Sequence, residues 1–77
     1  MVTIIIKSAK GEWETTFQKS TQVKNVILAV KVRDRLPKDG KYELTKDGEP
    51  EVVFEPERAL VNYGIKDGNT LVFRQLH

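Results

Sequence analysis

Few side chains of this sequence could carry out acid–base chemistry, and their positions do not favour it. The single histidine is the final residue, His77. A general base must be held close to its substrate, and the end of a chain rarely holds a side chain in place. The carboxylates are densest in a stretch that contains Glu49, Glu51, Glu55 and Glu57. Paired catalytic carboxylates need a pocket around them, whereas this spacing is typical of a solvated edge. We therefore expect no enzyme and no catalytic residue.

Residue patterns for metal or phosphate binding are also missing. The sequence has no cysteine, and no histidine–aspartate cluster has metal-ligand spacing. Gly40, Gly48 and Gly68 each follow an aspartate. Asp-Gly pairs are typical of tight turns, and their spacing differs from that of a glycine-rich phosphate-binding loop. The sequence thus predicts neither a metal site nor a cofactor.

Length and composition indicate one small soluble domain that spans residues 1–77. The formal net charge of +2 is too small to indicate a nucleic-acid-binding protein. Basic residues predominate up to residue 41 and acidic residues beyond it, an asymmetry that can steer charged partners. No apolar run approaches the ~18 residues of a membrane span. We expect a cytoplasmic monomer that binds proteins and has neither nucleic acid nor membrane as a partner.

The elements that would position any site begin with a hairpin. β-branched residues over 2–7 predict a strand, and a glycine-containing turn at 8–12 joins it to a second strand. In that second strand Trp13 and Phe17 share one face and would cover one end of the core.

The spacing of apolar residues then changes from that of a strand to that of a helix, over about residues 22–35. Ser20 or Thr21 can serve as its N-cap, and Pro37 with Gly40 would end it. We expect Arg35 in the last turn, where a cation suits the helix dipole.

The second half of the chain again reads as strands. A hairpin around Asp47-Gly48 is predicted in residues 41–54, with Val52 packed near the core. Pro56 would start a short helical turn, and Gly64 would end it in the left-handed conformation. The last strand covers residues 70–76.

This order predicts an α+β fold, in which one helix packs across a mixed sheet of four to five strands. The first and last strands are the most apolar, so we expect them to pair in parallel at the centre. This is the β-grasp arrangement. The residues expected to be mostly buried are Val2, Ile4, Ile6, Phe17, Val23, Val26, Val30, Leu44, Leu60, Ile65, Leu71 and Phe73.

Several residues stand at the spacing R-x-L-x-x-Y-x-I-x-x-x-x-T-L, namely Arg58, Leu60, Tyr63, Ile65, Thr70 and Leu71. The helix adds a second match at Val23, Asn25, Val26 and Val30. With these motifs the chain resembles the ubiquitin-like β-grasp family over nearly its whole length. Within that family, the pieces E-L-x-x-D-G at 43–48 and Y-G-I-x-D-G-x-x-L at 63–71 are most similar to small bacterial ubiquitin-like proteins. The resemblance implies that the hydroxyl of Tyr63 bonds a main-chain group between Asp47 and Phe54.

The resemblance implies two modes of action. The first is a bacterial protein modifier, whose C-terminus is activated by dedicated E1- and E2-like enzymes, after any trimming by a processing peptidase, and is attached to target proteins. His77 would then be the residue of conjugation, although the sequence lacks the family's Gly-Gly tail. The second is a non-covalent adaptor, similar to accessory subunits of specialised secretion systems, that is never conjugated.

The family's apolar docking triplet corresponds here to Ala9, Thr45 and Arg74. Because that apolar patch is lost and one position has become a cation, the usual receptors of the family should not bind this chain. Arg74 remains a candidate for contact with a different partner.

Other candidate partner-binding residues follow from the predicted faces. Ile5 would lie on the outer face of the sheet. Leu28 and Val32 point away from the apolar side of the helix at ~100° per residue, with Arg35 beside them. We expect this pair to form an exposed patch of the kind that often marks interaction sites. The alternatives are a rotated helix, or a loop that covers the ends of the helix.

Overall fold

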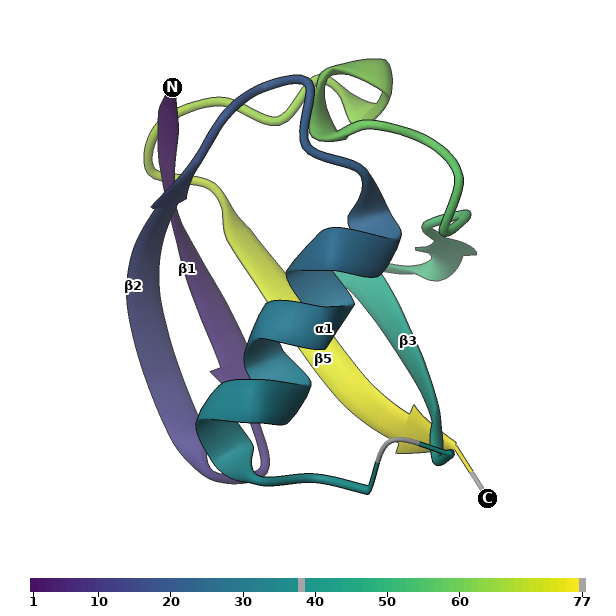
Figure 1. Cartoon of the computed structure of the whole chain (residues 1–77). Coiled ribbons are helices and arrows are strands. Elements are labelled where there is room, and N and C mark those ends of the chain that lie inside the picture. Colours follow the sequence, from purple (N-terminus) through teal and green to yellow (C-terminus); the bar gives the residue numbers. More distant parts are fainter. Residues whose placement is uncertain (38, 77) are drawn as a thin grey trace.

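The computed structural model describes residues 1–37 and 39–76, and within them one α-helix lies across a five-stranded sheet (Figure 1). The strands are β1 (Val2–Ser8), β2 (Gly11–Phe17), β3 (Lys41–Lys46), β4 (Glu49–Val53) and β5 (Thr70–Leu76). The helix α1 covers Val23–Asp34, and a 3₁₀ helix, η1, covers Leu60–Tyr63.

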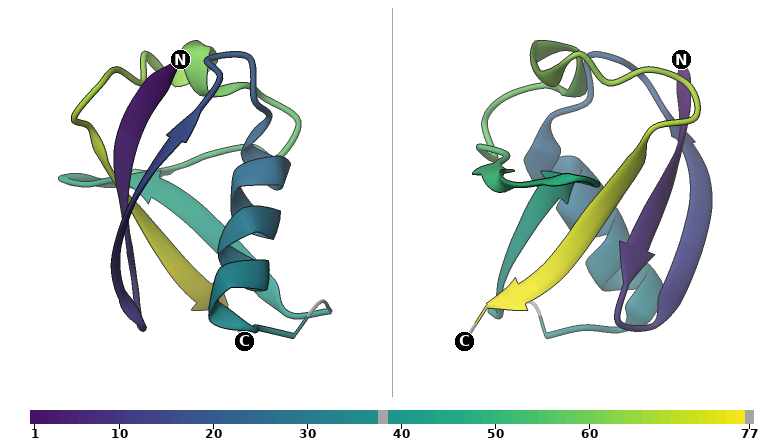
Figure 2. Two further views of the ribbon diagram at one scale, coloured as in Figure 1. Left: turned by 60° about the vertical axis from the view of Figure 1, so that its left-hand side comes forward. Right: turned by 180° about the vertical axis from the view of Figure 1, so that it is seen from behind.

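The strand order β2-β1-β5-β3-β4 places the first and last strands side by side at the centre. These two strands run parallel, with Ile6 opposite Leu71, and the other neighbouring pairs are antiparallel. Figure 2 shows α1 packed on one face of the twisted sheet. The architecture is β-grasp-like, as predicted.

The core lies between α1 and the sheet. It consists of Val2, Ile4, Ile6, Val23, Val26, Val30, Leu44, Phe54, Leu60, Ile65, Leu71 and Phe73. The predicted core is therefore confirmed except at Phe17, which is half-buried and packs against the cluster from β2 together with Trp13. Val52, expected near the core, is 39% exposed. It lies on β4, which is an edge strand and leaves each of its residues exposed.

The start of α1 differs from the prediction. The N-cap is Gln22 and not Ser20 or Thr21, and no side chain caps the helix there. The first amides of α1 are bonded instead by distant main-chain carbonyls. Val23 N–H donates to the Arg58 oxygen at 2.8 Å, and Lys24 N–H donates to the Pro56 oxygen at 3.0 Å. A loop thus replaces the side-chain cap, because it supplies acceptors to amides that would otherwise lack them.

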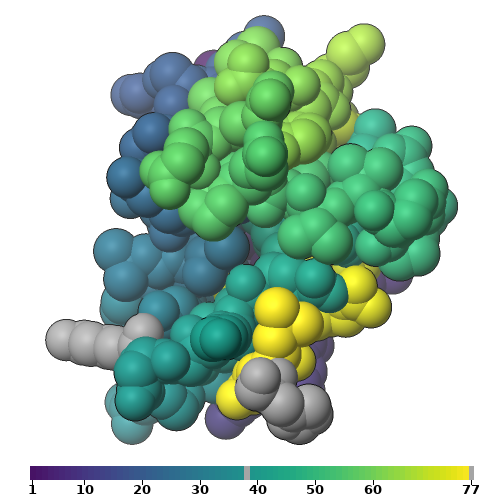
Figure 3. All heavy atoms as spheres, turned by 90° about the vertical axis from the view of Figure 1, so that its right-hand side faces the viewer, coloured from purple at the N-terminus to yellow at the C-terminus, as the bar shows by residue number. Residues whose placement is uncertain are grey.

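That loop is held by Tyr63. The Tyr63 hydroxyl accepts a hydrogen bond of 2.8 Å from the Glu55 N–H, and its ring stacks on Phe54 at a centroid distance of 4.0 Å. The predicted role is confirmed, but the bonded amide lies one residue beyond the predicted range. Figure 3 shows the same loop, in green, packed against the start of α1. The helical turn begins at Leu60, later than expected from Pro56, and Gly64 ends it at φ 65° as predicted.

The end of α1 also corrects the prediction. The helix ends at Asp34, and Arg35 follows as a C-cap in the left-handed region, with φ 55° and ψ 44°. Leu36 N–H donates to the Lys31 oxygen at 2.9 Å, and Arg35 N–H donates to the Val32 oxygen at 3.3 Å. This pair of bonds is a Schellman motif, which reverses the chain and directs Leu36 back towards the core.

Candidate functional site

The side of α1 that faces away from the sheet carries two exposed aliphatic residues. Leu28 is 51% exposed and Val32 is 70% exposed. The predicted exposure is therefore confirmed, and neither a rotated helix nor a covering loop hides the pair. Together with Lys31, Arg35 and Leu36 they line a shallow depression of about 260 Å³, which we call the helix hollow.

Cations border the helix hollow. The Lys31 ammonium lies over the ring of Tyr42, 5.3 Å from its centroid. Arg35 is exposed, and no carboxylate in the described part of the chain forms an ion pair with it. Within residues 1–37 and 39–76, no acidic side chain lines the hollow. The surface is thus apolar in the middle and basic at its margin.

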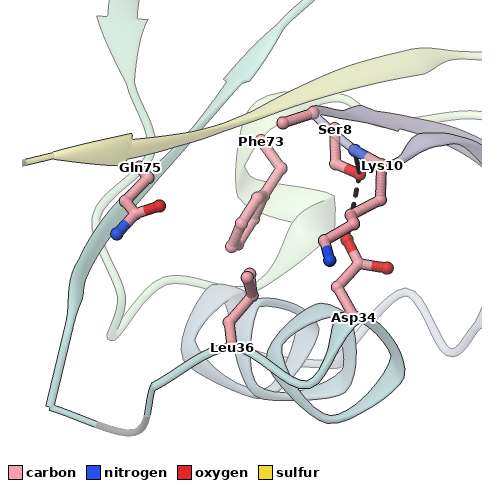
Figure 4. A pocket seen from close by; sticks show the side chains of 7 residues that line it. Ser8, Lys10, Asp34, Leu36, Phe73 and Gln75 are labelled. Atoms are coloured by element: carbon pink, nitrogen blue, oxygen red, sulfur yellow. Dashed lines mark hydrogen bonds between the residues drawn. The ribbon is translucent and has the colours of Figure 1, made fainter.

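A second depression lies where the sheet ends (Figure 4). We call it the sheet-end hollow, and its volume is about 130 Å³. Its lining residues are Ser8, Ala9, Lys10, Asp34, Leu36, Phe73 and Gln75. In Figure 4 the side chains of Leu36 and Phe73 approach one another from opposite walls.

Asp34 is a residue of this hollow that no sequence pattern indicated. Its side chain is almost fully buried, and both carboxylate oxygens are bonded. Arg33 Nη1 lies 2.9 Å from Oδ1, and the Ser8 hydroxyl donates to Oδ2 at 3.0 Å. The carboxylate therefore ties the end of α1 to the end of β1. Because each oxygen has a partner within the fold, the burial of this carboxylate is explained without a ligand.

The outer face of the sheet offers less than expected. Ile5 is half-buried beside Thr70 and Glu14. Arg74 forms an ion pair with the Glu43 carboxylate, which lies directly opposite it on β3. Thr45, at a position of the family's docking triplet, is 1% exposed and cannot serve as a docking surface. Its burial follows from its place on β3 between Val72 and Val53.

The structure thus brings together some predicted residues and separates others. Leu28, Val32 and Arg35 line one hollow. Ile5 and Arg74 lie on the opposite side of the sheet from α1, and they do not join that surface. His77, the predicted residue of conjugation, lies outside the described residues. Leu36, which sequence reasoning did not assign to a site, also lines the helix hollow. Tyr42, which the sequence placed facing the core, packs against the core and lies beneath Lys31 at the margin of the hollow.

Residues 1–37 and 39–76 contain no group of three potential metal ligands. The hydrogen bond and charge of Glu55 raise the pKa of Arg58, which leaves that guanidinium as a permanent surface cation. No described helix is both long and apolar enough to cross a membrane.

No family model matches this chain, and no curated protein is significantly similar to it.

Proposed function

We propose that this chain is a ubiquitin-like domain that acts by being bound by other proteins and carries out no chemistry itself. The observation that carries the proposal is the pair Leu28 and Val32, two large aliphatic side chains left exposed on a helix whose opposite face is fully buried. The motifs shared with the ubiquitin-like family and the β-grasp-like architecture support it.

The exposed pair needs a reason other than folding. Burying a leucine or valine side chain is worth about 1.5–3 kcal/mol, and a domain of this size has little stability to spare. A polar residue at either position would keep the helix and remove the apolar surface. Adjacent exposed aliphatic residues bordered by charges are typical of surfaces that another protein covers.

The first mode of action that we propose is that of a bacterial protein modifier in the cytoplasm. E1- and E2-like enzymes would activate the C-terminal carboxylate and transfer the chain to a target, with His77 as the joining residue. In support, β5 runs outward to Leu76 at an end of the sheet, away from the core (Figure 1). Enzymes, or receptors of the modified target, would then bind the helix hollow.

The second mode is a non-covalent adaptor, and one observation favours it. The helix hollow is a preformed depression that contains an apolar centre and a basic margin. Such a surface can bind a partner without any covalent step, so a conjugated C-terminus is not required for it to work.

Leu28→Asp and Val32→Asp test the proposal. Each places a charge in the apolar centre and should abolish the recovery of partners from native lysate by the tagged chain, while circular dichroism remains that of the wild type. Val61→Asp is the matched control, because Val61 is 54% exposed on η1 and does not line the helix hollow. Normal recovery by both helix variants would refute the proposal that the helix face binds partners.

A denaturing gel of lysate that contains the tagged chain separates the two modes. A modifier gives a ladder of heavier species that survives denaturation and disappears when His77 is deleted. An adaptor gives no such ladder, although photocrosslinking from position 28 still captures a partner. If the gel shows no ladder and photocrosslinking captures no partner, both modes are contradicted.

A further inference from the structure

The backbone at Arg35 is in a conformation that arginine disfavours. Among residues 1–37 and 39–76, Arg35 is the one non-glycine residue with a positive φ, at 55°. The left-handed region brings Cβ close to the following carbonyl oxygen, and glycine or asparagine normally occupies this position after a helix. The chain follows that rule elsewhere, since Gly64 ends η1 at φ 65°. The fold alone would therefore favour glycine at position 35.

The side chain of Arg35 forms no ion pair within residues 1–37 and 39–76 that would offset this strain. It is also exposed. By contrast, the neighbouring Arg33 lies over the ring of Trp13 and pairs with Asp34. A strained residue that is not used by the fold suggests a role in function. Arg35 lines the helix hollow, which is where that role would be exerted.

The shape of the hollow indicates what could fill it. Leu28 and Val32 are one helical turn apart, so they form an apolar row along α1 within the hollow, and Leu36 extends the apolar surface beyond the end of the helix. Such a depression can receive a ridge of side chains from another helix. The basic margin requires that the polar borders of this second helix be acidic.

We propose that the helix hollow binds an amphipathic helix of a partner protein, whose apolar stripe covers Leu28 and Val32 and whose bordering carboxylates pair with Arg35. This inference rests on the proposed function and specifies its partner. A guanidinium can hold a carboxylate through two parallel hydrogen bonds, which a lysine cannot do. A second copy of this chain would bring the same cations together, so charge repulsion disfavours self-association through this surface.

Three synthetic peptides serve as probes. The first is a helical peptide with leucines at positions i, i+3, i+4 and i+7, bordered by glutamates. The second has lysines in place of the glutamates, and the third has the composition of the first with the leucine spacing scrambled. Amide chemical shifts of the ¹⁵N-labelled full chain report where each peptide binds. We expect the glutamate peptide to shift residues 28–36, to bind at least about tenfold more tightly than the other two, and to weaken as salt is added.

Arg35→Gly gives a readout that a merely structural role would not produce. Because the strain is relieved, Tm should rise by about 4 °C for a domain this small. Binding of the glutamate peptide should weaken about tenfold, since one charge-assisted pair is lost. Arg35→Lys should retain part of the affinity. Lys66→Gln is the control, because it removes one exposed cation outside the hollow and should leave the affinity unchanged.

Four results would overturn the inference. They are no binding of the glutamate peptide, shifts on another face, equal affinity for the lysine peptide, or tighter binding to anionic phospholipid vesicles than to any peptide. An Arg35→Gly variant that is more stable and binds equally well would remove Arg35 from the site. If photocrosslinking in lysate still captures partners through another surface, the proposed function stands and only this inference fails.

Discussion

The two sides of α1 carry the same kinds of side chain in opposite environments. Val26 is fully buried against the sheet, whereas Val32, less than two turns later, is 70% exposed. Both are valines in one regular helix, so their propensity and chemistry are identical. The difference teaches that hydrophobicity alone does not assign a residue to the core, and that the rotation of the helix decides it.

Two sets of contacts fix that rotation. On the inner side, Val23, Val26 and Val30 are buried against the sheet. At the N-terminus, carbonyls of Pro56 and Arg58 bond the first amides of α1. Turning the helix would break both sets at once, which is why Leu28 and Val32 remain exposed.

The largest loss of stability is expected for Val26→Ala, on the buried side of α1. Removing two methyl groups from a filled core leaves a cavity, so the free energy of unfolding should fall by about 1–3 kcal/mol. Urea denaturation of the wild type and the variant measures the loss. Should the two proteins unfold at the same urea concentration, Val26 does not lie in the core, and the comparison of the two sides loses its basis.

The sequence is sufficient for the central fold because the relevant signals are periodic. Alternation in residues 2–7 and 70–76 identifies the central strands, and the spacing of Val23, Val26 and Val30 gives the helix phase. The exposed pair at Leu28 and Val32 follows directly from that phase. The apolar centre of the helix hollow is therefore predictable from the sequence alone.

The features that the sequence did not predict depend on contacts between distant segments. Such contacts leave no local pattern in the sequence. The predicted N-cap is wrong because a loop more than thirty residues away supplies the acceptors for Val23 and Lys24. Thr45 is buried because Val53 and Val72 flank it from neighbouring strands. The strained backbone of Arg35 has no sequence signal at all, since a glycine is the residue expected there.

A smaller loss of stability is expected for Tyr63→Phe. This variant tests the bonds from the Pro56 and Arg58 carbonyls to the first amides of α1. The variant leaves the Glu55 amide without its 2.8 Å partner, so stability should fall by about 0.5–1.5 kcal/mol. The ring stacking on Phe54 is retained. Because the loop that Tyr63 holds caps α1, the amides of Val23 and Lys24 should also exchange hydrogen faster than in the wild type.

Hydrogen exchange followed by NMR gives the site-specific part of this test. The amides of β1 and β5 serve as the internal control, since they lie at the centre of the sheet and are not bonded to the loop. Unchanged exchange at Val23 and Lys24, together with a lower global stability, would mean that the loop does not fix the helix.

The smallest effect on stability is expected for Val32→Ala, the exposed counterpart of Val26→Ala. The two substitutions remove the same atoms, but at position 32 the lost atoms already face water, so no cavity forms. Alanine also has the higher helix propensity, by up to about 0.7 kcal/mol. The free energy of unfolding should therefore stay within about 0.5 kcal/mol of the wild type or rise slightly. Affinity for the glutamate peptide should nevertheless fall, because the apolar row of Leu28 and Val32 on α1 loses its C-terminal half. A loss of stability equal to that of Val26→Ala would show that position 32 is covered in solution, and that the two sides of α1 do not differ as described.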